Sequence, residues 1–176
     1  LRNSQVRLTR LNRLYSVLSQ INETIVRFEN RQDLLNEVCR IIVEKGGITL
    51  AWICRYSSNA KGIKPVASYG PVEYIKTVEI SRTMDQQTSG PAARALRTGT
   101  YALASNIPLD ATFKNKASAA QFGLLSCAAY PFDFENNDRG CLIVYAGVPH
   151  FFENEENRLF QSLADDLSFA MYSMAS

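Results

Sequence analysis

The spacing of the apolar residues changes twice along the chain, and this order constrains the fold more than any other feature. Residues 4–28 and 31–45 carry apolar side chains at steps of three and four, which is typical of helices. Residues 48–147 hold short apolar runs separated by polar turns, and residues 153–174 return to the helical spacing. Long helices gathered at the two ends of a run of strands predict an α+β fold, because a parallel α/β sheet needs a helix after nearly every strand.

The middle of the chain predicts a central antiparallel sheet of about five or six strands. Short polar turns join neighbouring segments, as hairpins require. The predicted strands are residues 48–56, 63–70, 74–80, 101–105, 124–132 and 140–147. Two short helices are predicted between them, at 89–98 and 113–122. Ser89 is the expected N-cap of the first, and a glycine follows the last residue of each.

Composition excludes several classes of protein. The chain has 176 residues, 46% hydrophobic and 20% charged, which is enough to bury a core of its own. A net charge of +2 argues against a nucleic-acid partner. No run approaches the roughly 18 apolar residues of a membrane span, and the four cysteines are scattered without a CxxC pair. We therefore expect a cytoplasmic protein with no metal site, and the first residue, Leu1, suggests a piece of a longer chain.

Several segments resemble a GAF domain. The sequence SGPAARALRTG, followed by a strand and by SNIPLD, is similar to the family's central segment. GCLIVYAGVPHFFENEENRLFQSLADDLSFAM resembles its last strand, acidic cap and final helix, and LNRLYSVLSQINETIV with LLNEVCRIIVEKGGITLAWI resembles its entry helices and first strand. The similarity is greatest to GAF modules that precede GGDEF, EAL or histidine-kinase output domains in bacterial signalling proteins.

The resemblance implies how the elements are layered and what they do. The long helices should cover one face of the sheet, and the short helices and loops should cover a small-molecule pocket on the other. Residues 1–30 would form an N-terminal signalling helix, and residues 31–176 the GAF domain with its C-terminal helix. The implied function is regulatory rather than enzymatic: an unidentified small molecule binds, and the signal passes to an output domain, for example one of cyclic di-GMP turnover.

Alternation along the strands selects the side chains that could face the pocket, although it leaves open which face that is. We expect one set of strand residues to face the pocket, with further residues at the start of helix 89–98 and at the mouth of the pocket. The expected ligand contacts are Trp52, Cys54, Ser126, Ala128, Tyr130, Ile143 and Tyr145 from the strands, and Ser89, Gly90, Ser105, Asn106 and Phe122 around them.

Three specific ligands are disfavoured, so the cofactor remains unknown. Asn115-Lys116 and the later Phe151-x-x-x-Glu155-Glu156 resemble elements of cyclic-nucleotide GAF domains, but the second is also an ordinary acidic helix cap. Bilin attachment in relatives uses a Cys-His pair, which the sequence lacks. Haem would depend on the single histidine, His150.

One enzyme activity stays open as an alternative. Some GAF proteins reduce free methionine sulfoxide with paired cysteines in the pocket loops, whereas Cys39, Cys54, Cys127 and Cys141 fall in a helix and in strands. A second alternative is a ligand-free GAF module that serves only for dimerisation.

The helical stripes predict a homodimer. Helices 4–28 and 153–174 should lie side by side on one face of the sheet, so that two copies would form a four-helix bundle and relay the signal. The expected interface residues are Leu8, Leu11, Tyr15, Leu18, Ile25, Phe160, Leu167 and Met174.

Overall fold

The computed structural model describes residues 2–57, 62–77 and 90–174, with side chains from residue 4 onward. Its centre is one five-stranded antiparallel sheet with the strand order β2-β1-β5-β4-β3. The strands are β1 (Leu50–Ser57), β2 (Gly62–Tyr69), β3 (Ala102–Ala104), β4 (Ser126–Asp133) and β5 (Arg139–Ala146). The predicted α+β class and the antiparallel sheet are confirmed.

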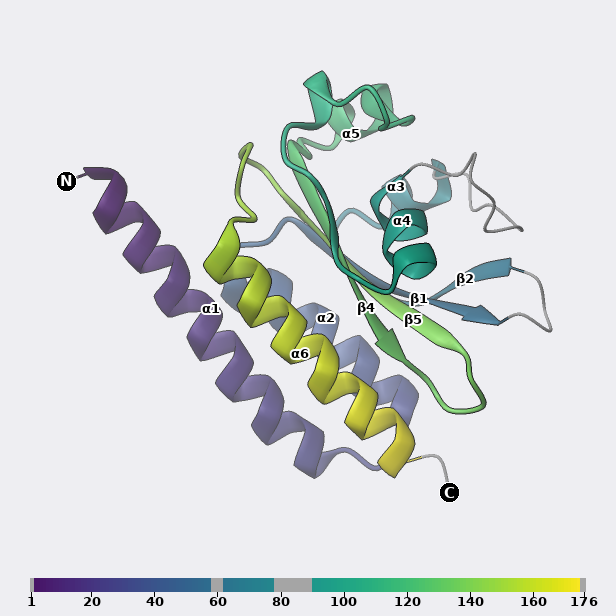
Figure 1. Ribbon diagram of the computed structural model, residues 1–176. Helices are drawn as coiled ribbons and strands as arrows, with labels where there is room; N and C mark the ends of the chain where they lie inside the picture. Colours follow the sequence, from purple (N-terminus) through teal and green to yellow (C-terminus); the bar gives the residue numbers. More distant parts are fainter. Residues whose placement is uncertain (1, 58–61, 78–89, 175–176) are drawn as a thin grey trace.

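Helices cover both faces of this sheet (Figure 1). The long helices α1 (Arg2–Arg27), α2 (Arg31–Gly46) and α6 (Asn154–Ser173) form one layer. The short elements lie over the other face: α3 (Glu73–Thr77), α4 (Pro91–Thr98), the 3-10 turn Ile107–Leu109 and α5 (Lys116–Gln121). We call this second layer the roof.

Local chemistry explains where several helices begin and end. The Asn30 side chain accepts a hydrogen bond from the backbone N–H of Asp33 at 2.9 Å and so caps α2, and Gly47 ends α2 with a φ of 72°. The prediction of Ser89 as the cap of α4 is wrong. Gly90 is the N-cap, without a side-chain hydrogen bond, and Pro91 fixes the first helical φ. Ser89 itself lies outside the described residues.

Residues 74–80 were predicted as a strand, and the described part of this segment is helix α3 instead. Tyr74 and Ile75 are adjacent and both buried, whereas a strand would turn them to opposite faces. The backbone N–H groups of Tyr74 and Ile75 donate to the carbonyls of Pro71 and Val72, which starts the turn. Residues 78–80 lie outside the described part of the chain.

The sheet separates two apolar clusters. The first, the helix-side core, joins α1, α2 and α6 to one set of strand residues, among them Ile53, Tyr130, Leu142 and Val144. The second, the roof-side cluster, lies between the sheet and the roof. Its buried members are Leu50, Trp52, Cys54, Tyr74, Ile75, Ala95, Leu96, Ala104, Ile107, Phe113, Ala119, Leu124, Cys127, Ala129, Cys141, Ile143 and Tyr145.

Helix α1 is joined to the rest of the molecule by packing and by ion pairs. Leu14, Val17 and Ile21 are buried in the helix-side core. Arg7 donates to both carboxylate oxygens of Glu156 on α6, each at 3.1 Å, and the Glu156 side chain is fully buried. Arg10 adds a longer contact of 3.7 Å to the same carboxylate. The proposed division of the chain at residue 30 stays a prediction.

Candidate functional site

Strand register arranges the sheet side of the roof-side cluster as a grid. On β1, Leu50, Trp52 and Cys54 pair with Tyr145, Ile143 and Cys141 of β5. On the other side of β5, Cys127 and Ala129 of β4 pair with Tyr145 and Ile143. Directly paired residues of antiparallel strands project to the same face. The expected set Trp52, Cys54, Ile143 and Tyr145 therefore lies together beneath the roof.

The face predicted for β4 is wrong. Ala128 and Tyr130 pair with Val144 and Leu142, and all four residues belong to the helix-side core. Ser126 pairs with Ala146 of that same core, and its hydroxyl donates to the Val148 carbonyl at 2.8 Å. A shift of one residue in the register of a strand moves every side chain to the opposite face of the sheet. Only the pairing of β4 with β5 therefore fixes which residues of β4 face the roof and which face the long helices. The residues that β4 contributes to the roof side are Cys127 and Ala129.

The expected mouth residues lie around the edge of the cluster. Phe122 packs against it and contacts the Tyr74 ring edge-on, with centroids 6.3 Å apart. Ser105 accepts a backbone hydrogen bond from His150, and Asn106 precedes the 3-10 turn. No atom of the described residues lies within 4 Å of the place where a Gly90 side chain would begin. Whether any of these residues contacts a ligand stays a prediction.

The buried groups of the roof-side cluster are uncharged. Burial raises the pKa of the Tyr74 and Tyr145 phenols and of the Cys127 thiol, which therefore stay protonated at neutral pH. The four buried polar or charged residues that the described part of the chain contains, Thr24, Ser126, Glu156 and Asn157, lie outside this cluster.

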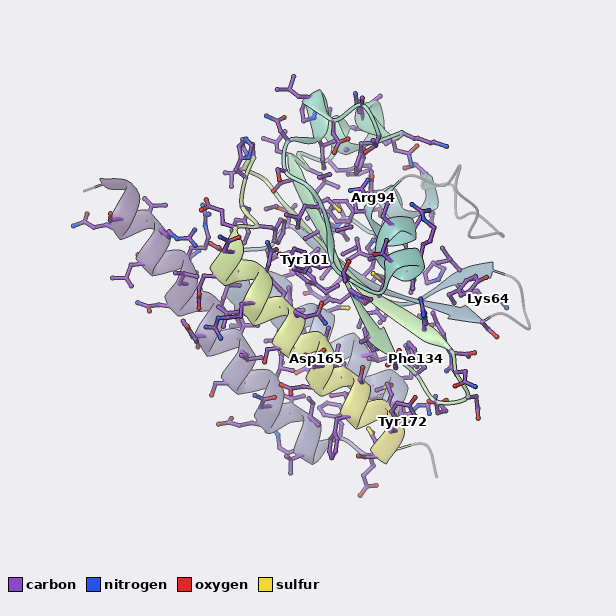
Figure 2. The ribbon with its side chains drawn as sticks, in the orientation of Figure 1. Lys64, Arg94, Tyr101, Phe134, Asp165 and Tyr172 are labelled. Carbon is purple, nitrogen blue, oxygen red and sulfur yellow. The ribbon has the colours of Figure 1, made fainter. Side chains whose placement is uncertain are left out.

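Arginines at the edge of the roof bind protein groups. Arg94, on α4 (Figure 2), donates to the Leu103 carbonyl at 2.7 Å and to the Thr112 hydroxyl at 3.2 Å. Arg139, at the start of β5, donates to the Leu96 carbonyl. The roof-side cluster is therefore a buried apolar layer with a few neutral polar atoms.

One of these polar atoms, the Trp52 indole nitrogen, has no hydrogen-bond partner within the criteria of distance and angle among the described residues. The indole Nε1 of Trp52 is buried, and no hydrogen-bond acceptor reaches it within the described residues. Burial raises the pKa of the Tyr145 phenol, and the neighbouring Trp52 indole N–H opposes that rise. Trp52 is the single tryptophan of the chain.

Comparison with known proteins gives the family. The sequence model of the GAF domain matches residues 29–171, which is most of the chain. The chain belongs to the GAF domain family. No curated protein matches the sequence.

Solved structures agree with this GAF fold at low sequence identity. Free methionine-R-sulfoxide reductase from Neisseria meningitidis, in complex with its substrate, is 14% identical with a TM-score of 0.74, over 92% of this chain and 90% of that one. The GAF domain of a phosphoenolpyruvate-protein phosphotransferase from Coxiella burnetii is 15% identical with a TM-score of 0.73, over 94% and 95%. The A. aeolicus nlh2 GAF domain is 12% identical with a TM-score of 0.68, over 93% and 98%.

The cysteines of this GAF domain are all buried free thiols. Cys54 and Cys141 are direct partners on β1 and β5, whereas Cys39 lies in the helix-side core. Burial raises the pKa of Cys39, Cys127 and Cys141, and for Cys141 the neighbouring Cys54 thiol adds to the effect. A thiol acts as a nucleophile in its thiolate form, so these environments suppress reactivity.

Two features that suggested other ligands have structural roles in this domain. Phe151 is buried on the helix side, where the Arg10 guanidinium lies 4.4 Å from its ring centre, and Glu156 pairs with Arg7. His150 is an exposed loop residue with a φ of 57°. Among the described residues, no group of three or more His, Cys, Asp or Glu side chains could hold a metal ion. None of the described helices is long and apolar enough to cross a membrane.

A cleft of about 580 Å³ opens away from the roof, between the first half of α1 and one end of the sheet. Arg10 and Arg13 line it together with Gly47, Thr49 and Phe151. In this half of α1, Arg7 pairs with Glu156 of α6 and the Arg10 guanidinium lies over the Phe151 ring.

The predicted dimer residues fall into two groups. Phe160 and Leu167 are buried in the helix-side core, and the Phe160 ring stacks on Tyr130 with centroids 5.3 Å apart. Assigning these two to an interface with a partner is therefore wrong, because they point toward the domain's own sheet. Leu11, Leu18, Ile25 and Met174 pack partly against the same core. Leu8 and Tyr15 remain exposed.

Proposed function

We propose that this GAF domain is a sensory module that binds a small molecule on the roof side of its sheet and relays binding through a homodimer of α1 and α6 to a linked output domain. An output domain of cyclic di-GMP turnover or of histidine-kinase type is the form we favour, in a cytoplasmic bacterial protein. The observation that carries the proposal is an exposed apolar stripe on the α1–α6 pair.

The stripe has the spacing of a coiled-coil seam. Leu8 and Tyr15 are seven residues apart and are 60% and 47% exposed, while Leu11, Leu18 and Ile25 between and beyond them are half-buried. Val26, 85% exposed, continues the exposed side. Helix α6 runs beside α1 in the same direction (Figure 1).

Helix α6 adds its own exposed aromatic residues near its end. Phe169 is 75% exposed, and Tyr172 lies in the last turn of α6 (Figure 2) and is 55% exposed. The Tyr15 hydroxyl donates to Glu155 of α6 at 3.0 Å, which joins the two helices at the other end of the stripe. A second copy of the chain would cover these apolar groups.

A physical path connects the roof side to this seam. Along β5, Ile143 faces the roof-side cluster while its neighbours Leu142 and Val144 face the helix-side core. A ligand that displaces the Ile143 side chain therefore also moves the strand against which the long helices pack. Because α1 is held to α6 through Arg7 and Glu156, the two helices would shift together.

The dimer is tested by charging exposed stripe positions. Leu8→Asp and Phe169→Asp should each turn a dimer into a monomer in analytical ultracentrifugation, because a carboxylate would be buried at the seam. Ser16→Asp is the matched control, since Ser16 is exposed on α1 and lies about 100° around the helix from Tyr15. Leu11 and Leu18 are less suitable, because they pack on the domain's own core. An oligomer unchanged by both variants would contradict the seam.

Ligand binding is tested on the protein as purified. Native mass spectrometry and an absorption spectrum of one sample should show bound mass or a visible band if a ligand is retained. A clean dimer without bound mass would favour the alternative of a dimerisation module that needs no ligand.

The reductase alternative deserves its own assay, because one similar structure is a free methionine-R-sulfoxide reductase. We propose that this domain acts as a sensor and not as a reductase, since the roof-side thiols are buried and protonated. Turnover of free methionine-R-sulfoxide with a thiol reductant, lost in a Cys127→Ser variant, would overturn this proposal.

A further inference from the structure

The cleft beside the first half of α1 has the size of a small-molecule site. Its volume is about 580 Å³, within the range of about 300–1,000 Å³ that is usual for ligand pockets. Side chains of α1 form one side of it, and the turn after α2 and the end of β5 form the other. The cleft is therefore a candidate site on a different part of the domain from the roof side.

Two arginines make the lining of the cleft positive. Arg10 and Arg13 line it, and none of the other described residues that line it is charged. Residues 1–3, which begin the same helix, include no acidic residue in the sequence. The charge of this cleft therefore favours an anion.

The ion pairs nearby leave part of this positive charge uncompensated. Arg7 pairs with Glu153 and Glu156, and Arg10 lies 3.7 Å from Glu156. Arg13 is exposed and forms no ion pair within the described part of the chain. Three arginines therefore share two carboxylates, and one positive charge remains for a ligand.

The Arg13 guanidinium lies against the backbone at the end of α2. A Cβ at residue 47 would lie 3.1 Å from Arg13 Nη1, so Gly47 leaves the space that the guanidinium uses. The carbonyl groups at a helix C-terminus attract a cation, which favours this position of Arg13. A guanidinium carries several N–H donors in one plane, so donors remain for a second partner.

Uncovered apolar side chains line the same cleft. Val6 is 56% exposed and Val148 is 45% exposed. The Phe151 ring also lines the cleft, with the Arg10 guanidinium 4.4 Å from its centre. A molecule with a hydrocarbon part would remove these apolar groups from water while its charge faces the arginines.

We propose that this cleft binds a small organic carboxylate whose charged group pairs with Arg10 and Arg13. The apolar body of the molecule lies on Val6, Val148 and Phe151. Carboxylate and guanidinium groups match in geometry, so two parallel hydrogen bonds can form. The single uncompensated charge favours a monoanion over a dianion, and the apolar lining favours an organic over an inorganic anion. Since α1 and the end of the sheet both contact the molecule, binding fastens the first half of α1 to the domain.

Three probes separate the charge from the apolar body. They are 3-phenylpropionate, 3-phenyl-1-propanol and acetate, which carry respectively both features, the apolar body alone and the charge alone. In ¹H–¹⁵N spectra of the purified domain at pH 7, 3-phenylpropionate should saturably shift the backbone amides of Gly47, Thr49 and Gly147. The alcohol should bind about tenfold more weakly, the size of one charge-assisted hydrogen bond. Acetate should give no saturable shift at the same concentrations.

Arg13→Gln tests the cation directly. The affinity for 3-phenylpropionate should fall about tenfold in this variant, while the affinity for the alcohol should not change. Arg27→Gln is the matched control, because it removes the same charge from an exposed position of α1 that does not line the cleft. Both positions are exposed, so both variants should fold. Amide hydrogen exchange of residues 5–13 should slow when 3-phenylpropionate is bound to the wild-type domain.

Four results would overturn the inference. They are equal binding of the carboxylate and the alcohol, equal binding of acetate and 3-phenylpropionate, an affinity unchanged by Arg13→Gln, and amide shifts confined to roof-side residues such as Ala95 and Ala129. Unchanged hydrogen exchange in residues 5–13 would overturn the fastening of α1. The sensory function proposed above concerns the roof side, and native mass spectrometry of the purified domain tests it separately.

Discussion

The ion pair between α1 and α6 gives the most direct test of how the signalling helix is held. The Glu156 carboxylate is fully buried and receives two hydrogen bonds from Arg7, at 3.1 Å each, while Arg10 is 3.7 Å away. Replacing Arg7 by Met keeps much of the aliphatic side chain but leaves a buried carboxylate with one distant cation. Breaking a buried pair in this way costs about 3–5 kcal/mol.

The partial exposure of the arginine reduces that figure. The Arg7 side chain is 33% exposed, and Arg10 remains as a second cation, so we expect Arg7→Met to lower the free energy of unfolding by about 2–3 kcal/mol. Glu156→Gln should lose less, about 1 kcal/mol, because it removes the buried charge and leaves the arginines able to turn toward water. Arg7→Met is expected to be the more destabilising change because it leaves the buried Glu156 charge without its partner, whereas Glu156→Gln removes that charge.

Urea unfolding followed by Trp52 fluorescence and by far-UV circular dichroism measures both losses. In a domain of this size the Arg7→Met loss corresponds to a drop in Tm of about 4–12 °C. Arg13→Met is the matched control, since Arg13 is exposed on the same helix, and it should stay within about 0.5 kcal/mol of wild type. The reasoning is refuted if Arg7→Met resembles that control, or if Glu156→Gln is the more destabilising of the pair.

Three further predictions concern a buried hydrogen bond, a glycine in close contact with a ring, and two buried thiols. Tyr130→Phe should lower the free energy of unfolding by about 1–3 kcal/mol in urea, because the buried Tyr130 hydroxyl donates to the Asn157 side-chain oxygen at 2.7 Å and that oxygen would lose the bond. Gly140→Ala should lower the free energy of unfolding by about 1–3 kcal/mol, measured as a drop in Tm, since the new Cβ would lie 2.5 Å from the Phe134 ring; Gly62→Ala, where no atom of the described residues lies within 4 Å of the new Cβ, is its control. Burial raises the pKa of the Cys127 and Cys141 thiols above the unfolded value of about 8.5, so their contribution to stability is complete below that pH and is lost above it, by about 1.4 kcal/mol per pH unit for each thiol. Unfolding curves that do not shift between pH 8 and 10 would contradict this, as would rapid labelling of the native thiols by iodoacetamide at pH 8.

Part of the site could be predicted from the sequence because alternation is local. Trp52 and Cys54 share a face of β1 simply because they are two residues apart, and the same holds for Ile143 and Tyr145 on β5. Leu14 and Ile21 are seven residues apart and so share one side of α1, and both are buried in the helix-side core. Such patterns depend on neighbouring residues in one element, and those residues keep their relation in any fold.

The errors concern relations between elements. Ala128 and Tyr130 alternate as expected, but their face depends on pairing with β5, and no local pattern contains that register. Phe160 and Leu167 carry the spacing of a helical seam, yet the same spacing serves a helix that packs on its own sheet. Residues 74–80 have the composition of a strand, but the adjacent residues Tyr74 and Ile75 are both buried in the roof-side cluster, which favours a helical turn instead.

The sequence by itself determined the three long helices, the five strands of the sheet, the α+β class and membership of the GAF family, because these follow from periodicity and from motifs along the chain. Only the tertiary structure decided that Glu156 lies buried against Arg7 and that Cys127 rather than Ala128 lies beneath the roof. Each of these depends on residues from different elements meeting at atomic distance. Hydrogen bonds and charges act over a few ångströms, and folding alone brings such groups that close.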